Sequence, residues 1–352
     1  MINLIGYPEI KLKEKFLDWG VKPYRANQIF TWVYHHGARS WEEMTNLSKD
    51  LRQTLSDHFF IKLPHIERKL ASRDGSIKYL FRLEDGETVE SVWMPNEDRR
   101  TLCISTQVGC RLACAFCMTA TLNLQRNLTS AEIIGQYMAV KDDREQGSTA
   151  TARGNGVTNV VIMGMGEPLD NYGPVVDAVR LMISPQALKI STRKVTLSTA
   201  GLVDKIKKFQ TEGLHVNLAI SLNATEDATR DKIMPINKKY PIKVLLETLR
   251  AYPLKPNRRL TIEYVLLGGV NDKGEDAVRL AGLLRGIPCK INLIPFNPFD
   301  KSGFSPPARD SVLEFQNYLL SRNFTVFVRV NRGADIMGAC GQLAGQRAPI
   351  PT

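Results

Sequence analysis

The run Cys110-Arg111-Leu112-Ala113-Cys114-Ala115-Phe116-Cys117 carries more chemical information than any other segment of this chain. It sets three cysteines in the spacing C-x3-C-x2-C, and three thiolates so close together favour an iron–sulfur cluster or zinc over harder metal ions. A structural zinc site normally completes its tetrahedron with a fourth protein ligand, whereas a cubane cluster held by three cysteines leaves one iron free. The histidines nearest to this run are His65 and His215, so the sequence offers no local fourth ligand.

Two alternatives to a cluster stay open on these residues alone. Cysteines are often buried without a metal, and a compact trio can form a zinc site that a distant group completes. The aromatic residue before the third cysteine, Phe116, favours the cluster. The pattern C-x3-C-x-aromatic-C resembles the signature of radical S-adenosylmethionine (SAM) enzymes. That resemblance implies that Cys110, Cys114 and Cys117 bind the irons, with Phe116 beside the cofactor, and that the free iron chelates the amino acid end of SAM.

The composition indicates an ordinary soluble globular protein. Of 352 residues, 43% are hydrophobic and 24% are charged, and no run approaches 18 consecutive apolar residues. The first residues also lack the long apolar core of a secretory signal, so we expect a cytoplasmic protein with no membrane contact. In that compartment six cysteines are typical of metal binding or catalysis rather than of a disulfide framework.

The net charge indicates a polyanionic partner. Lysine and arginine outnumber acidic residues 47 to 36, which gives a net charge of +11 and a pI near 9.3. An excess of this size favours nucleic acid binding. Single basic pairs such as Lys207-Lys208 are as typical of a solvated loop, so only the overall excess carries the argument.

The hydrophobic pattern changes its period along the chain. Residues 1 to about 60 follow a helical period, with Ser48 as an N-cap, and residues 65–95 alternate like two or three antiparallel strands with Asp-Gly turns. After about residue 100, short β-rich runs alternate with amphipathic helices, which is typical of repeated βα units around a parallel sheet. We therefore predict an α/β fold with an accessory region at 1–95, a core at 96–345 and a C-terminal tail at 346–352.

About six βα units fit into the predicted core, which favours a partial (βα)6 barrel with its chemistry at the loops after the strands. One of its helices begins near Thr129, where Glu132 completes a capping box. The loop at 146–156 is rich in Gly, Ser, Thr and Ala, and we expect a mobile surface loop there. The expected strands are 101–105, 157–163, 194–197, 214–221, 260–266, 290–294 and 325–330.

Small polar residues follow several of these strands, where ligand groups are expected. A Gly166-Glu167-Pro168 turn follows the second strand, and its carboxylate can accept hydrogen bonds from an ammonium group. Turns and helix caps use the same residue types, so each motif alone is weak. The other candidates for contact with the cofactor are Ser198, Ser221, Leu222, Asn223 and Asn297.

Two further cysteines lie far apart in the sequence. Cys103 lies seven residues before Cys110 on the first expected core strand, and Cys340 precedes Gly341 near the C-terminus. A glycine after a cysteine permits tight backbone geometry and access to the thiol. The remaining one, Cys289, is interpreted as a buried apolar residue.

Together these motifs resemble the RlmN/Cfr family of radical SAM RNA methyltransferases over residues 5–345. Gly-Glu-Pro at 166–168 and Asn-Pro-Phe at 297–299 are closer to the RlmN branch, which methylates carbon-2 of adenosine. The matching segments are TLCISTQVGCRLACAFCMT, NLTSAEIIGQ, MGMGEPLDNY, VTLSTAGLV, MPIN, GGVND, LIPFNP and ACGQL.

The resemblance implies a mechanism that uses one 4Fe–4S cluster and two molecules of SAM per turnover. Cys340 takes a methyl group from the first SAM, and a carbon radical derived from the second removes a hydrogen from that methyl. The resulting methylene radical adds to the adenine ring. Cys103 then acts as a resolving cysteine that forms a transient disulfide with Cys340, and Glu90 accepts the ring proton.

The resemblance also names the partners. They are 23S rRNA in the peptidyl transferase region, tRNA next to the anticodon, and an electron donor such as flavodoxin or ferredoxin. The resemblance implies that the accessory region at 1–95 contacts RNA. Two rivals remain. A Cfr-type enzyme would methylate carbon-8 of the rRNA adenosine, and a zinc-stapled RNA-binding protein would have no catalytic activity.

Overall fold

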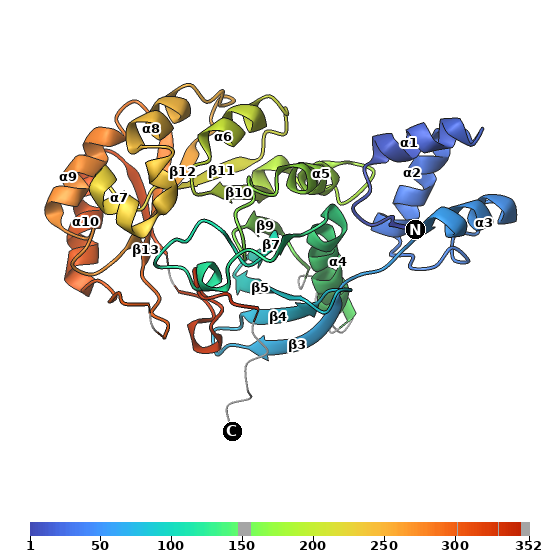
Figure 1. Cartoon of the computed structure of the whole chain (residues 1–352), viewed down its shortest axis with the longest axis horizontal. Helices are drawn as coiled ribbons and strands as arrows, with labels where there is room; N and C mark the ends of the chain where they lie inside the picture. The colour runs from blue at the N-terminus through green and yellow to red at the C-terminus, as the bar shows by residue number, and fades with distance from the viewer. Residues whose placement is uncertain (147–155, 301, 330, 346–352) are drawn as a thin grey trace.

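A single ten-stranded sheet runs through the computed structural model, which describes residues 1–146, 156–300, 302–329 and 331–345 (Figure 1). In the order in which they pair, its strands are β14 (Thr325–Val328), β13 (Cys289–Pro295), β12 (Leu260–Leu266), β11 (Asn217–Ser221), β10 (Val195–Thr199), β9 (Asn159–Ile162), β6 (Arg99–Cys103), β5 (Thr88–Asn96), β4 (Ile77–Arg82) and β3 (His65–Ala71).

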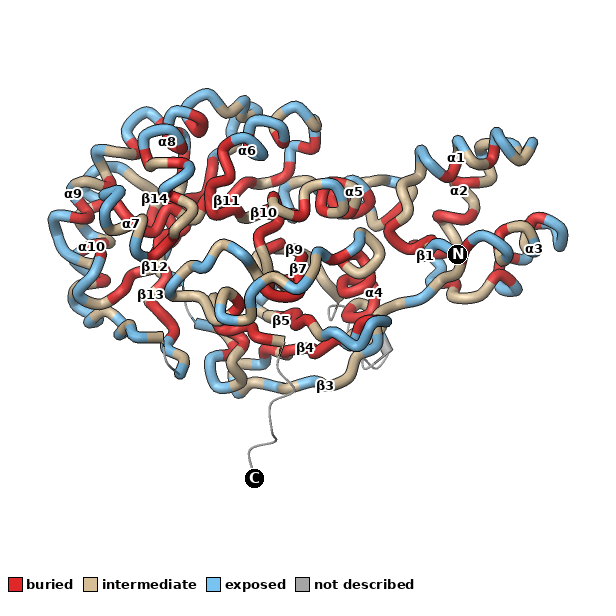
Figure 2. The backbone as a smooth tube through the Cα atoms, viewed as in Figure 1, coloured by how far each residue is buried: buried red, intermediate tan, exposed pale blue. Residues whose placement is uncertain are grey.

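Strand β6 and strands β9 to β14 pair with one another in parallel and form the predicted partial barrel. Figure 2 shows these strands as mostly buried, inside a rim of helices whose outer residues are exposed. Six βα units result, which confirms the predicted α/β architecture. Their helices are α4 (Ser130–Gln146), α5 (Tyr172–Ile183), α6 (Val203–Gln210), α7 (Asp227–Ile233), α8 (Ile242–Arg250), α9 (Gly274–Leu283) and α10 (Arg309–Ser321). In the described part of the chain, five units have one helix each, and the unit that begins with β11 has two, α7 and α8.

Local capping explains where two of the helices begin. The backbone N–H of Thr129 donates to Oε2 of Glu132 at 2.8 Å, and the N–H of Glu132 donates to Oγ1 of Thr129 at 3.2 Å. This reciprocal pair is the predicted capping box, and it precedes α4. Ser48 likewise accepts from the N–H of Leu51 at 3.3 Å at the start of α3 (Lys49–His58).

The antiparallel strands β3, β4 and β5 continue the barrel sheet. Strand β5 pairs with β6 in antiparallel register, with Val92 opposite Cys103. The division proposed at 95–96 therefore crosses a continuous sheet. Residues 1–95 contain two different parts, a helical module and three strands of the main sheet.

The helical module projects to one side of the core (Figure 1). It contains α1 (Glu9–Asp18), α2 (Tyr24–Phe30), a π-helical turn η1 (Thr31–His35) and α3, and a two-stranded parallel sheet of β1 (Ile2–Asn3) and β2 (Phe59–Phe60) joins its ends. The predicted helical character is confirmed.

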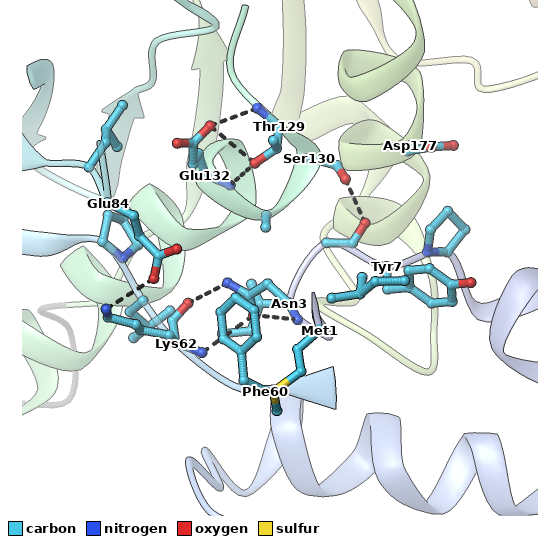
Figure 3. Close-up of a pocket in the computed structure, with 18 of the residues that line it drawn as sticks. Met1, Asn3, Tyr7, Phe60, Lys62, Glu84, Thr129, Ser130, Glu132 and Asp177 are labelled. Carbon is cyan, nitrogen blue, oxygen red and sulfur yellow. Dashed lines mark hydrogen bonds and ion pairs between the residues drawn. The ribbon is translucent and has the colours of Figure 1, made fainter. Parts of the chain in front are cut away.

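A hollow marks the junction between this module and the core (Figure 3). Its polar groups bind one another: Nζ of Lys62 lies 3.0 Å from a carboxylate oxygen of Glu84, and Oγ of Ser130 donates to the carbonyl of Gly6 at 2.7 Å. A Cβ on Gly6, whose φ is +79°, would lie 2.2 Å from the nitrogen of Ala131. The close approach at Gly6 and the Ser130 hydrogen bond fix the module against α4, and the Lys62–Glu84 pair joins its end to the turn after β4.

Two predicted segments lie outside the described residues: most of the loop at 146–156, of which 147–155 are not described, and the tail at 346–352. Within the described ranges, no helix is both long enough and apolar enough to cross a membrane.

Candidate active site

The cysteine run forms a loop at the carboxyl end of the first barrel strand. A short antiparallel pair, β7 (Gln107–Val108) and β8 (Arg126–Asn127), closes the base of this loop. Gly109 follows β7 with a φ of +76°, and a Cβ there would lie 1.6 Å from the carbonyl oxygen of Asn123. Only glycine allows this crossing, which folds the loop back over the barrel.

The thiols of Cys110, Cys114 and Cys117 all line one cavity. Desolvation raises the pKa of each of them, and the Coulomb interaction with Cys117 raises the pKa of Cys110 and of Cys114 further. A cluster would supply the positive charge that turns such thiols into thiolates. Within the described residues, no three Cys, His, Asp or Glu side chains converge on a single metal ion. Three separated thiols in one cavity fit a cubane, because each thiolate then binds a different iron.

Most of the predicted cofactor residues line this same cavity. Glu167 is buried, and its carboxylate accepts from the N–H of Ala200 at 2.7 Å and from the N–H of Leu169 at 3.0 Å. Desolvation raises the pKa of Glu167 to about 7, although these hydrogen bonds oppose the shift. The lining also contains Phe116, Gly166, Ser198, Ser221, Asn223 and Asn297, which come from the loop and from the ends of β9, β10, β11 and β13.

Leu222 occupies a different environment from its neighbours. Its side chain is fully buried and is not part of the cavity lining. Its backbone N–H donates to the carbonyl of Glu263 at 3.0 Å. Asn223 lies in the left-handed region at φ +57°, and its Oδ1 accepts from the N–H of Val265 at 2.8 Å. The turn at 222–223 therefore holds the end of β11 against β12.

Cys340 lies against the cysteine loop although more than 200 residues separate them in the sequence. The N–H of Met118, next to Cys117, donates to the carbonyl of Gly341 at 2.7 Å. The amide of Asn297 donates to the carbonyl of Cys340 at 3.3 Å. Cys340 lines the same cavity as the three loop cysteines and remains exposed there. These contacts set Cys340 at the edge of this cavity, where desolvation raises the pKa of its thiol.

Cys103 lies at the end of β6 and is buried. Desolvation and the negative charge of Cys340 raise the pKa of Cys103 to about 12. All six cysteines are free in this structure, so the transient disulfide stays a prediction.

Glu90 is buried in β5 but is not part of the cavity lining. Its Oε1 lies 3.0 Å from Nζ of Lys78, and its Oε2 accepts from the N–H of Ala344 at 2.9 Å. Lys78 also donates to the carbonyl of Met337 at 3.2 Å. The pair therefore holds both sides of the segment 333–345, which carries Cys340.

Comparisons with known proteins agree with this geometry. Residues 2–61 match the family model described as the ribosomal RNA large subunit methyltransferase N-terminal domain, and residues 104–281 match that of the radical SAM superfamily. A dual-specificity RNA methyltransferase RlmN from Geobacter sulfurreducens is 51% identical over 346 residues, which cover 98% of this chain and 93% of the relative. This chain belongs to the RlmN family.

Other RlmN relatives and one solved structure support the same assignment. The Rhodospirillum rubrum RlmN is 45% identical and is covered over 80% of its length, against 97% of this chain. The crystal structure of a radical SAM methyltransferase from Sphaerobacter thermophilus superposes with a TM-score of 0.89 at 40% identity, covering 98% of this chain and 100% of the other. As an RlmN-family radical SAM enzyme, the protein is an RNA methyltransferase that uses a 4Fe–4S cluster and SAM. This excludes the zinc-stapled, non-catalytic alternative.

Two charged residues of the cavity in this RlmN-family chain were not predicted from the sequence. Glu263 in β12 and Arg329 after β14 both line it. Desolvation raises the pKa of Glu263, while Arg329 and a 2.8 Å hydrogen bond from Asn292 oppose the shift. A carboxylate in the middle of the apolar strand LTIEYVL is the signal that could have revealed Glu263.

Proposed function

We propose that this enzyme methylates carbon-2 of adenosine in the peptidyl transferase region of 23S rRNA and in tRNA next to the anticodon. The names of its RlmN relatives, which specify dual-specificity RNA methyltransferases, support two RNA substrates. One observation carries the chemistry. The segment of Cys340 is hydrogen-bonded to the residue after Cys117, and both thiols line one cavity.

Different residues of the cavity serve methyl transfer and SAM binding. When bound, the cluster and SAM supply a methyl group and a carbon radical. The thiolate of Cys340 displaces that methyl from sulfur and holds it as a thioether at the cavity edge. Glu167 and the ends of β10 and β11 orient the amino acid and ribose parts of SAM, because a carboxylate suits an ammonium group and Ser198 or Ser221 suits hydroxyls.

Release of the product requires a thiol and a base. The ring adduct first has to lose its ring proton and one electron, which an oxidised cluster would accept. The thiolate of Cys103 then attacks the sulfur of Cys340, so that the carbon–sulfur bond breaks, a disulfide forms, and the carbon of the product keeps the bonding electrons and takes up a proton to become the methyl group. The high pKa of Cys103 in this state keeps the thiol protonated until that step. Glu90 is the assigned acceptor of the ring proton. In this structure the carboxylate of Glu90 is bound by the ammonium group of Lys78 and the N–H of Ala344. For Glu90 to accept the ring proton, the segment 333–345 therefore has to shift when RNA binds.

The RNA partner has to present an unstacked base. An adenine inside a helix cannot reach an enclosed radical site, so the base must leave its stack. We assign the grip on the surrounding backbone to the excess positive charge and to the accessory region at 1–95, which includes the helical module. We also assign a cytoplasmic location and a flavodoxin or ferredoxin as electron donor.

Mass spectrometry of protein purified without oxygen tests this function. We expect a methyl group on Cys340 of the wild type, RNA covalently trapped on Cys103→Ala, and 2-methyladenosine in digests of treated rRNA and tRNA. Cys289→Ala is the matched control, since Cys289 is buried and lies outside the cavity lining, and it should trap no RNA. An unmodified Cys340 in cluster-loaded protein given SAM would refute the methyl-carrier role. 8-Methyladenosine would assign the Cfr-type activity instead.

A further inference from the structure

Arg230, in α7, is a buried cation whose partners are almost all uncharged. Its side chain has 0% exposure. Of the residues that the structure describes, none offers its guanidinium a carboxylate oxygen within 4.0 Å. A buried charge without a counter-ion is costly, so a site that retains one usually has an anion nearby in its working state.

The hydrogen bonds of Arg230 converge on the cofactor side of the barrel. Nε donates to the carbonyl of Leu222 at 2.8 Å, and Nη2 donates to the carbonyls of Ala200 at 2.8 Å and Ser221 at 3.1 Å. These carbonyls belong to the ends of β10 and β11, next to Ser198 and Asn223. The planar fork of arginine therefore joins the two strand ends that line the SAM cavity.

The remaining guanidinium nitrogen, Nη1, is linked through Asn237 to two carboxylates nearer the surface. Nη1 donates to Oδ1 of Asn237 at 3.0 Å, and the amide nitrogen of Asn237 donates to Asp227 at 2.9 Å and to Asp231 at 2.8 Å. The amide thus separates the guanidinium from both carboxylates. Neither carboxylate is buried, so water screens much of their charge.

The cysteine loop lies on the other side of Arg230. The N–H of Ala115 donates to the carbonyl of Ile233 in α7 at 2.9 Å, and Cys114 packs against a small apolar cluster that includes Ile233 and Met234. Burial lowers the pKa of Arg230 to about 10, and the charge of Cys114 is the largest effect that opposes this shift. Three thiolates and a 4Fe–4S core together carry a net negative charge, which grows by one unit on reduction.

We propose that Arg230 is the buried counter-charge of the iron–sulfur cluster and the positioning residue that fixes the ends of β10 and β11 for SAM. The cation favours the more negative, reduced cluster and so raises its reduction potential. The inference rests on the cluster and SAM that radical SAM enzymes use and is independent of which adenine carbon is methylated.

Two substitutions separate the charge from the hydrogen bonds. Arg230→Gln removes the charge, and Arg230→Lys keeps it but loses the planar fork. Arg279→Gln is the matched control, because Arg279 is 38% exposed and is paired with Asp276 at 2.6 Å. Each full-length protein is loaded with iron and sulfide without oxygen, and its cluster is titrated by redox-controlled electron paramagnetic resonance. Binding of SAM is measured by calorimetry.

For Arg230→Gln we expect the equilibrium constant for reduction to fall about tenfold, which is a shift of about 59 mV to more negative potential. Loading the cluster should also raise its melting temperature less than it raises that of the wild type. Arg230→Lys should keep the wild-type potential and bind SAM about tenfold more weakly, and Arg279→Gln should match the wild type in both.

A wild-type potential in Arg230→Gln would overturn the counter-charge role. If the glutamine variant does not fold, Arg230→Lys decides both points: wild-type SAM affinity would overturn the positioning role, and a clearly lower potential would overturn the charge role. A methyl group at carbon-8, or an absent methyl on Cys340, would contradict the proposed function without affecting these readouts.

Discussion

Replacing Lys78 with methionine is expected to lower the free energy of unfolding by about 3–5 kcal/mol, the usual cost of leaving one charge of a buried pair without its partner. Nζ of Lys78 and Oε1 of Glu90 are 3.0 Å apart, and the two side chains are only 10% and 4% exposed. Methionine has a similar length, so the change removes the charge and the hydrogen bond to Met337 without opening a large cavity.

Urea titrations of Lys78→Met, Glu90→Gln and the double variant measure the coupling between the two residues. The double variant should cost clearly less than the sum of the single ones, because it leaves no buried charge unpaired. Lys69→Met is the control on the neighbouring strand. Lys69 is paired with Asp143 at 2.6 Å but is 50% exposed, so its loss should cost less than about 1 kcal/mol.

The same variants test whether this pair positions the methyl carrier. In Lys78→Met, hydrogen exchange across residues 333–345 should become faster and the methylated fraction of Cys340 should fall, whereas Lys69→Met should change neither. Additive free energies together with unchanged exchange would refute the reasoning. Glu90 would then be stable without its lysine, and the segment would be held by its other contacts.

Two further changes concern the cavity itself. Gly341→Ala should reduce the methylated fraction of Cys340 in peptide mass spectra, because φ is +82° at this glycine and a Cβ would lie 3.3 Å from the carbonyl of Phe116. Affinity for SAM should fall by about tenfold between pH 8 and pH 6, because the raised pKa of Glu167, about 7, leaves this carboxyl neutral at the lower pH. Calorimetry should show that this pH dependence is lost in Glu167→Gln, and a dependence that persists would contradict the role of Glu167 in binding the ammonium group.

The core strands could be predicted because their sequences bury both faces. The run predicted as a strand at 260–266 is β12 at Leu260–Leu266, and the expected strand at 194–197 is β10 at Val195–Thr199. Apolar β-rich runs between amphipathic helices specify such strands locally. The order of the strands then follows from the right-handed βα connection.

Pairing between distant elements could not be predicted in the same way. The sequence indicated antiparallel strands at 65–95, but nothing in it shows that β5 pairs with β6 and extends the barrel sheet. Strand edges carry the same backbone groups whatever their sequence, so the choice of partner depends on the whole fold. The contact of Cys340 with the cysteine loop followed only from the resemblance to a family.

The sequence also did not reveal which charged residues are buried. Lysine and arginine are mostly exposed in folded proteins, so their residue type alone predicts that Lys78 and Arg230 lie on the surface. Both are buried because each satisfies several backbone carbonyls or a carboxylate that no apolar side chain could bind. Such positions are visible only when the surrounding carbonyls have been placed in space.

The segment that carries Cys340 is also the last described part of the chain to be synthesised. Its partners on β4 and β5, Lys78 and Glu90, are synthesised much earlier. Lys78 precedes its partner Met337 by 259 residues, and Glu90 precedes its partner Ala344 by 254. Because translation proceeds from the N-terminus, the nascent chain can complete the cysteine loop and most of the barrel before Cys340, the proposed methyl carrier, is made. A product that stopped before residue 333 would keep the three cysteines proposed as cluster ligands and lose Cys340. Under the proposed function, only complete translation joins radical generation to its acceptor.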